Sequence, residues 1–325
     1  MRAIVFDHPG SPEVMHLSEV PDPLPLAGEV LVRVRAAGVN RADLLQRLGR
    51  YPAPPGASEI LGLELAGEIV AVGPGCTRRR AGERVMAVTT GGGYATLATV
   101  PETATMLVPA GLDWRAAAAV PEAFLTAYLN LFDLGGLVAG ESVLVHAGAS
   151  GVGSAAIQLA REAGAMVLTT AGSDEKLAFC RELGASVAIH RESEDFGAAA
   201  LDATGGAGVH LILDFVGAPY WADNVRALRR GGRLAIIGFL GSSRGDIDLG
   251  PVLRKSLTVR GTTLRGMAAA DKAALVERAS TFILPRLADG RLRALVDRTF
   301  PLAAAAEAHH HMHANANRGK IILEP

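Results

Sequence analysis

The stretch Val143-Leu144-Val145-His146-Ala147-Gly148-Ala149-Ser150-Gly151-Val152-Gly153 decides how this chain folds. An apolar run breaks into a glycine-rich turn, and the turn opens into a helix-compatible segment from Ser154 to Ala163. Glycines let the backbone approach a bound group closely, and the first N–H groups of a helix attract anions. This strand–turn–helix order therefore predicts a turn that holds the pyrophosphate of a dinucleotide.

The residues after the turn support that interpretation over its alternative, a flexible glycine loop that binds nothing. A second apolar strand is expected at 166–170 and a charged helix at 174–183. Further strands are expected at 186–190, 210–214, 233–238 and 257–262, with helices between them such as 221–228. Alternating strands and helices favour a doubly wound parallel sheet, and hence an α/β fold.

The residue patterns in the two end segments of the chain differ from those of the middle segment. In the first third, 28–38 alternates apolar and charged residues, and further strands are expected at 65–72, 84–88 and 94–100. This pattern predicts a compact β-rich domain with little helix. Residues 115–134 are helical in period with a break at Pro121, a helix is expected at 268–279, and the chain ends in strand-and-helix segments.

Bulk composition excludes several classes of protein. The chain has 325 residues, enough for two domains, and a formal net charge of −1, so we expect no binding to nucleic acid or to anionic membranes. No apolar run is long enough to span a bilayer, and the N-terminus reads as a strand rather than a secretory leader. Cys76 and Cys180 are the only cysteines, which fits a cytoplasmic protein without a disulfide framework.

Several separated motifs, in one order, resemble the zinc-independent quinone oxidoreductases of the medium-chain dehydrogenase/reductase superfamily, most of all the p53-inducible subgroup. They are Asn40-Arg41-Ala42-Asp43-Leu44, Tyr51 to Ser58, Ile60 to Gly67, Pro121 to Ala127, His146 to Gly153, Ala156 to Leu159, Leu211 to Asp214 and Gly319 to Leu323. The resemblance covers nearly the whole chain. It implies a Rossmann coenzyme domain at 123–264 and a GroES-like catalytic domain from 1–122 and 265–325. It also implies an active site in the cleft between them, and a homodimer formed through edge strands near 233–262.

Zinc-dependent relatives have a cysteine where Asn40 stands and a histidine where Leu63 stands. Asparagine is a poor zinc ligand, leucine is none, and Glu64 alone does not hold a catalytic zinc. We therefore expect no metal site. Without a Lewis acid to stabilise an alkoxide, hydride delivery to an acceptor that is already electron-poor remains feasible. This favours reduction of a quinone or of an activated alkene.

The resemblance also indicates catalytic candidates. Tyr51 matches a cleft tyrosine that stabilises developing charge or donates a proton, and Thr126 matches a residue that orients the nicotinamide. Asn40 can hydrogen-bond a carboxamide or a substrate oxygen. The alternatives are a packing aromatic for Tyr51, an interior helix hydroxyl for Thr126, and a helix cap for Asn40. Loop 46–60 and Tyr94 are expected to set the size of the acceptor.

The end of the second strand bears on cofactor choice. NAD enzymes place an acid there, on the ribose 2′-hydroxyl. Here Gly172 takes that position, while Ser173, Lys176 and Arg191 can bind a phosphate. This pattern favours NADPH, unless neighbouring Asp174 and Glu175 turn inward; a solvated helix start is the alternative.

The remaining expected cofactor contacts fall into two groups. The turn supplies Ala147, Gly148, Ser150, Gly151, Val152 and Gly153, and the segments flanking the nicotinamide supply Gly238, Phe239, Leu240, Thr263 and Leu264. The second group has ordinary strand-to-loop breaks as its alternative.

Histidines at 309, 310, 311 and 313 suggest a metal, and His309 and His313 could share a helix face. Because the spacing implies no third ligand, we favour a solvated helix. The sequence thus predicts an NADPH-dependent quinone reductase. The alternatives are an NADPH-dependent reductase of α,β-unsaturated carbonyls and a binding or structural protein that holds NADPH without turnover.

Overall fold

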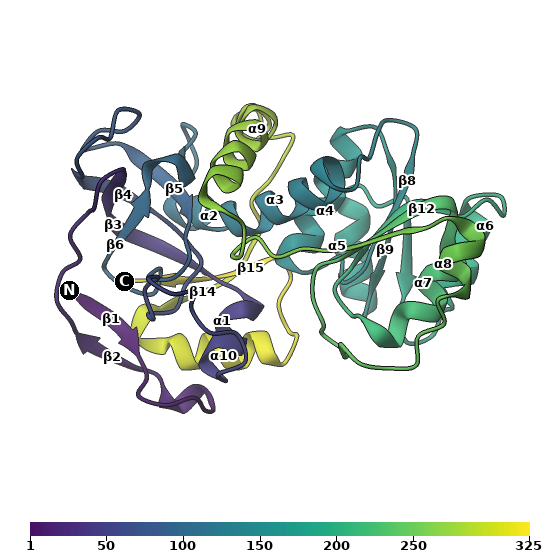
Figure 1. The fold of residues 1–325 in the computed structure, drawn as a ribbon, viewed down its shortest axis with the longest axis horizontal. Coiled ribbons are helices and arrows are strands. Elements are labelled where there is room, and N and C mark those ends of the chain that lie inside the picture. Colours follow the sequence, from purple (N-terminus) through teal and green to yellow (C-terminus); the bar gives the residue numbers. More distant parts are fainter. The chain divides into compact units, whose positions relative to one another are not determined.

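The computed structural model describes residues 1–325, which divide into two compact units. One unit is central in sequence and comprises residues 126–263. The other, here called the bipartite unit, combines residues 1–125 with 264–325, so both ends of the chain belong to it. In Figure 1 the bipartite unit runs from purple to blue and from yellow-green to yellow, and the central unit runs from teal to green. The sequence predicts domain boundaries after 122 and after 264.

A six-stranded parallel sheet forms the middle of the central unit. Its strands lie in the order β10-β9-β8-β11-β12-β13, so the chain starts in the middle and winds outward in both directions. Their bounds are β8 Ser142–Val145, β9 Met166–Ala171, β10 Val187–His190, β11 Val209–Asp214, β12 Leu228–Ile236 and β13 Thr258–Gly261. The expected α/β fold with a doubly wound parallel sheet is confirmed.

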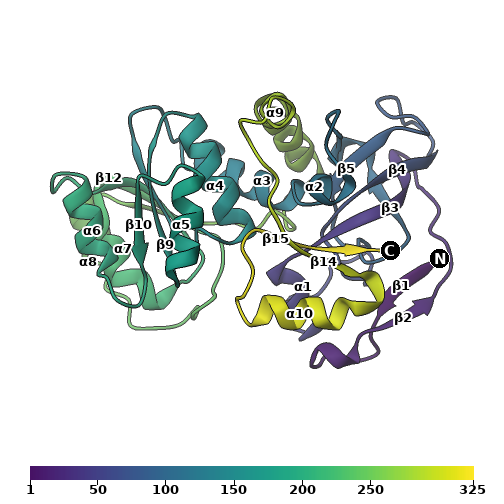
Figure 2. The same cartoon turned by 180° about the vertical axis from the view of Figure 1, so that it is seen from behind.

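Helices cover both faces of this sheet (Figures 1 and 2). The first pair, α4 Gly151–Glu162 and α5 Asp174–Glu182, packs on strands β8, β9 and β10. The other face carries α6 Phe196–Ala203, α7 Trp221–Ala227 and α8 Gly250–Lys255. Continuous apolar strands such as Val143–Val145 are buried because both faces are covered.

The bipartite unit is built on a mainly antiparallel seven-stranded sheet. It follows the order β14-β15-β3-β4-β5-β7, and β6 pairs with β3. The strands are β3 Glu29–Val39, β4 Glu64–Val72, β5 Arg84–Val88, β6 Leu97–Pro101, β7 Thr105–Leu107, β14 Val296–Pro301 and β15 Lys320–Glu324. A separate hairpin joins β1 Arg2–Val5 and β2 His16–Glu19. The β-rich domain expected from the sequence is therefore present.

One helical prediction is confirmed and one needs correction. The helical stretch expected at 115–134 breaks at Pro121 as predicted: it comprises α2 Trp114–Ala118 and α3 Pro121–Tyr128, and it ends in a π-helical turn at Leu129–Asp133. The helix expected at 268–279 is α9 Ala269–Ala288, which continues past its predicted end because Ile283 and Leu287 extend the buried stripe. The remaining helices of this unit are α1 Arg41–Arg47 and α10 Ala305–His313.

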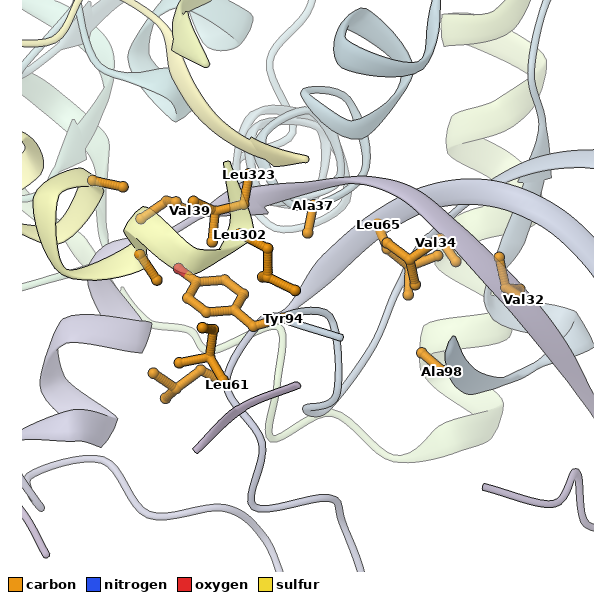
Figure 3. Close-up of a cluster of buried hydrophobic side chains, with 14 of the residues drawn as sticks. Val32, Val34, Ala37, Val39, Leu61, Leu65, Tyr94, Ala98, Leu302 and Leu323 are labelled. Carbon is orange, nitrogen blue, oxygen red and sulfur yellow. The ribbon is translucent and has the colours of Figure 1, made fainter. Parts of the chain in front are cut away.

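Tyr94 belongs to the core of the bipartite unit, so the prediction that it sets acceptor size is wrong. It is fully buried, and its ring lies beside Leu61 and Leu302 (Figure 3). A side chain with no exposed surface cannot line an acceptor site.

None of the helices combines the length and apolar character needed to cross a bilayer.

Candidate active site

The glycine turn after β8 presents unpaired backbone donors. Ser150 caps α4, and its hydroxyl accepts the N–H of Gly153 at 3.0 Å. No protein group accepts the N–H of Gly151 or Val152. These two donors lie at the N-terminus of a twelve-residue helix, where the helix dipole also favours an anion.

Close packing beneath the turn explains its glycines. A Cβ atom on Gly148 would lie 2.0 Å from Thr169 Oγ1, and one on Gly153 would lie 2.3 Å from the Ala147 carbonyl oxygen. The Thr169 hydroxyl has no freedom to move away, since it donates to the Val145 carbonyl at 2.7 Å. The turn therefore needs glycine at both positions, and it lies directly on the second strand.

A buried network that the sequence did not predict ties together the strand ends around the turn. His146 contacts Thr170 Oγ1 at 3.0 Å through Nδ1 and Asn224 Oδ1 at 2.8 Å through Nε2. The Asn224 amide nitrogen donates to Asp214 Oδ2 at 3.1 Å, and Asp214 Oδ1 accepts the N–H groups of Val216 and Gly217. This network joins β8, β9 and β11 at their carboxyl ends.

The direction of each bond in this network follows from the amide. Because the Asn224 nitrogen donates to Asp214, its oxygen accepts, and His146 Nε2 carries the proton. His146 Nδ1 then accepts the Thr170 hydroxyl proton. Burial lowers the pKa of His146 to about 4, so the ring is neutral at physiological pH. His146 thus joins these strand ends as a neutral hydrogen-bonding group.

The end of β9 places Arg191 against Gly172. A Cβ atom on Gly172 would lie 2.8 Å from Arg191 Nε, so the guanidinium occupies the space a side chain there would take. Ser173 caps α5 by accepting the Lys176 N–H at 3.3 Å. The exposed Asp174 and Glu175 do not turn inward.

The other expected cofactor residues of the central unit lie in loops after the strands. Phe239 and Leu240 are exposed, and a Cβ atom on Gly217 would lie 2.6 Å from the Phe239 ring. Thr263 is exposed, whereas Leu264, the first residue of the second part of the bipartite unit, is buried. Thr126 is buried in α3, and its carbonyl accepts the Asn130 amide at 2.9 Å.

Asn40 caps α1 and has its side chain bonded within the protein. Its own N–H donates to Asp43 Oδ2 at 2.8 Å in a capping box. Its amide nitrogen donates to Glu64 Oε1 at 3.0 Å, and its amide oxygen accepts the Lys320 ammonium at 2.7 Å. Both ends of the amide are therefore engaged within the protein.

A buried ion pair lies behind Asn40. Lys320 Nζ is 2.5 Å from Glu64 Oε1 and also donates to the Val39 carbonyl at 2.8 Å. The other Glu64 oxygen accepts the Glu122 N–H at 2.8 Å, while neighbouring Leu63 is buried. Glu64 is thus saturated by an ammonium, an amide and a backbone N–H. No three His, Cys, Asp or Glu side chains lie together as metal ligands.

Tyr51 is partly buried and pairs with Arg265. The Arg265 guanidinium lies 5.3 Å from the centre of the tyrosine ring. It is held there by two hydrogen bonds to the Thr90 carbonyl, at 2.9 and 2.6 Å. Burial raises the pKa of Tyr51, and the Arg265 charge opposes that shift. The phenol is thus protonated at neutral pH and can donate a hydrogen bond.

The histidine cluster is not a fully solvated helix face, so that expectation is wrong for His309. Its Nε2 lies 3.1 Å from the Tyr94 hydroxyl, which donates to Asp43 Oδ2 at 3.0 Å. The ring is fully buried, and its Nδ1 lies 3.5 Å from Arg47. Only His310 and His313 are well exposed. Helical spacing identifies a shared face but does not show what that face packs against.

Comparisons with known proteins agree with this architecture. Residues 26–110 match the alcohol dehydrogenase GroES-like domain, and residues 151–281 match the zinc-binding dehydrogenase family. Over 328 residues the chain is 33% identical to the quinone oxidoreductase of Sus scrofa, covering 99% of this chain and 97% of that protein. The chain belongs to the quinone oxidoreductases of the medium-chain dehydrogenase/reductase superfamily.

Two solved structures illustrate the range of this fold. The Escherichia coli quinone oxidoreductase in complex with NADPH has a TM-score of 0.91 at 30% identity, over the whole of both chains. The CurK enoyl reductase has a TM-score of 0.88 at 28% identity, covering 99% of this chain and 98% of that one.

Proposed function

We propose that this protein is an NADPH-dependent reductase of quinones. The observation that carries the proposal is the contact of Arg191 with Gly172 at the end of β9. A cation stands where an NAD enzyme has a carboxylate, and a guanidinium binds phosphate in a bidentate manner. The similarity to an oxidoreductase complexed with NADPH supports the same cofactor.

The residues of the central unit fit such a dinucleotide. The free N–H groups of Gly151 and Val152 suit a pyrophosphate, and Gly148 and Gly153 leave the space that a side chain would fill. Ala147 and Ser150 complete this turn, and Ser173 and Lys176 would join Arg191 at the phosphate. For the nicotinamide we propose contacts from Gly238, Phe239, Leu240, Thr263 and Leu264, with Thr126 orienting the ring.

When bound, NADPH supplies a hydride, and the protein's own groups handle charge and orientation. The Tyr51 phenol, held against Arg265, would donate a hydrogen bond to the oxygen on which negative charge develops. Asn40 acts as a positioning residue, because its amide is bonded to Lys320 and Glu64. Loop 46–60 would set the acceptor's size. The groups around Asn40 and Leu63 present an ammonium rather than metal ligands, so we propose a reaction without zinc.

A second candidate, reduction of α,β-unsaturated carbonyls, is favoured by the likeness to an enoyl reductase. Both reactions deliver a hydride to an electron-poor acceptor. Steady-state NADPH oxidation with matched panels of quinones and enones separates them: the proposal expects higher kcat/KM for quinones. Higher values for enones would assign the second activity. NADPH binding without turnover of either panel would indicate a non-catalytic binding protein.

We further propose a homodimer that forms through β13, the edge strand of the central sheet. All four residues of β13 are exposed, and Val259 is an apolar residue on it. An unpaired edge strand is a template for pairing with a second copy. Light scattering is expected to give twice the chain mass; a monomer at micromolar concentration would contradict this.

The unpaired Cys76 and Cys180 fit a cytoplasmic location, and the net charge of −1 fits a small-molecule partner rather than nucleic acid or membrane.

A further inference from the structure

The Glu122 carboxyl group has no partner within the protein. Its neighbours Asn40, Glu64 and Lys320 are bonded to one another. Glu122 lies in the first turn of α3, and its backbone N–H is bonded to Glu64. No hydrogen bond or ion pair of the structure ends on its own carboxyl group, although the side chain is only partly exposed. Its oxygens are not among the enclosed side-chain atoms that lack a partner, so a molecule from solution can reach them.

The cations near Glu122 are committed to other groups. Lys320 is bonded to Glu64, to Asn40 and to the Val39 carbonyl. From α9, Lys272 donates to the Arg265 carbonyl at 3.4 Å, and Arg265 itself is bonded to Thr90. None of these cations forms an ion pair with Glu122. The carboxyl group is thus left available to a molecule from outside the protein.

The surroundings also favour the neutral form of this acid. Burial, followed by the negative charge of Glu64, raises the pKa of Glu122 to about 8. Asp43 adds to this rise, whereas Lys320 and Lys272 oppose it. Tyr51 and Arg265 complete the set of titratable groups that face this region. At neutral pH the Glu122 carboxyl therefore carries a proton.

Tyr51 is less suited to give up a proton than Glu122. Burial raises the pKa of Tyr51 above its ordinary value of 10.0, and the charge of Glu122 contributes to that rise. A general acid works best when its pKa lies near the working pH. The two side chains interact electrostatically, so they lie in one region of the bipartite unit and can have separate roles toward one acceptor. Tyr51 then binds the acceptor oxygen while Glu122 provides the proton.

We propose that Glu122 is the general acid that protonates the acceptor after hydride delivery. This rests on the proposed function. Reduction of a quinone to a hydroquinone takes one hydride, supplied by NADPH as it is oxidised to NADP⁺, and one proton. The Glu122 O–H bond breaks as a new O–H bond forms on the reduced acceptor. The resulting carboxylate then takes a proton from water, so the cycle consumes one proton from solution.

A direct titration tests the protonation state without any turnover. Infrared difference spectra of the protein between pH 6 and pH 10 are expected to show loss of a carboxylic acid band with a midpoint near pH 8. Glu122→Gln should remove that band. Glu102→Gln, which changes another buried carboxyl of the same unit, should keep it. A wild-type protein without such a band would overturn the proposal.

Kinetics test the role itself. Wild-type kcat for quinone reduction should fall as pH rises through 8. Glu122→Gln should lower kcat by about tenfold or more and remove this limb, with an unchanged Kd for NADPH. Glu122→Asp should retain the limb at an intermediate kcat. Because the wild-type limb needs no variant, the test holds even if Glu122→Gln folds poorly.

The outcomes separate the two proposals. If the wild type reduces quinones but Glu122→Gln keeps both kcat and its pH dependence, the acid role is wrong and the proposed function stands. If the wild type reduces neither quinones nor enones, the proposed function fails and the acid role fails with it, whatever the infrared titration shows.

Discussion

Lys320 and Glu64 form a buried ion pair with 2.5 Å between Nζ and Oε1, and they come from the two separate segments of the bipartite unit. Strands β15 and β4 each lie beside β3, which brings the two residues together. The pair orients Asn40 and the first turn of α3. The ion pair therefore joins the two segments of the bipartite unit beside the residues proposed to act on the acceptor.

Lys320→Met should lower the free energy of unfolding by about 3 kcal/mol or more, because it leaves the Glu64 charge buried without its cation. Urea denaturation followed by circular dichroism measures this loss. Arg115→Met is the matched control: its bidentate pair with Glu324 is exposed to solvent, so its removal should cost much less stability. Equal losses for the two variants would contradict the structural role of the buried pair.

Asp43 makes stability depend on pH in an unusual direction. Burial raises its pKa from 3.8 to about 6, so the folded state binds its proton more tightly than the unfolded state does. The favourable contribution is full below about pH 4 and is lost as pH rises to about 6. Relative to Asp43→Asn, the wild type should lose roughly 3 kcal/mol over that interval. Paired urea titrations from pH 4 to pH 7 measure the difference, and a flat difference would contradict the raised pKa.

Arg191 should decide the preference for NADPH. Arg191→Ala is expected to weaken NADPH binding by about 10- to 100-fold through loss of charge-assisted hydrogen bonds, and to leave NADH binding within about twofold. Fluorescence titration with both cofactors measures this. Glu192→Gln is the control, since it frees Arg191 from an exposed ion pair and should not weaken NADPH binding. Equal affinity of the wild type for NADPH and NADH would remove the argument.

Gly148 should tolerate no side chain. In Gly148→Ala the new Cβ would meet the anchored Thr169 hydroxyl, so the turn must shift, at a cost of about 1–3 kcal/mol. NADPH binding should weaken along with stability, because the turn carries the free N–H groups. Thermal unfolding and NADPH titration of the variant measure both effects. A variant that unfolds and binds NADPH as the wild type does would contradict the need for glycine at this position.

Much of the fold could be predicted from the sequence because it depends on local signals. Alternating strands and helices predict the parallel sheet. Glycines next to an apolar strand predict that the turn at 148–153 binds a dinucleotide. The extent of α9 could not be predicted in the same way. Its last turns are defined by burial against the rest of the unit, and a Pro285 inside the helix argues locally for an earlier end.

The candidate site was harder to predict, because its main contacts join residues distant in sequence. Asn40 reads equally well as a cap or as a substrate contact until Lys320 and Glu64 are seen to engage its amide. In the same way, the helical spacing of His309 suggests a solvated side chain, but the structure buries it against Tyr94. The protonation of Glu122 depends on Glu64 and on burial, neither of which a local pattern reveals.

The central claim is that this protein transfers a hydride from NADPH to a quinone. It is tested most directly by following NADPH absorbance after adding the purified protein to a panel of quinones, with NADH and enones in parallel. We predict turnover that is saturable in quinone and faster with NADPH than with NADH. No acceleration with any quinone, at protein concentrations that bind NADPH, would contradict it.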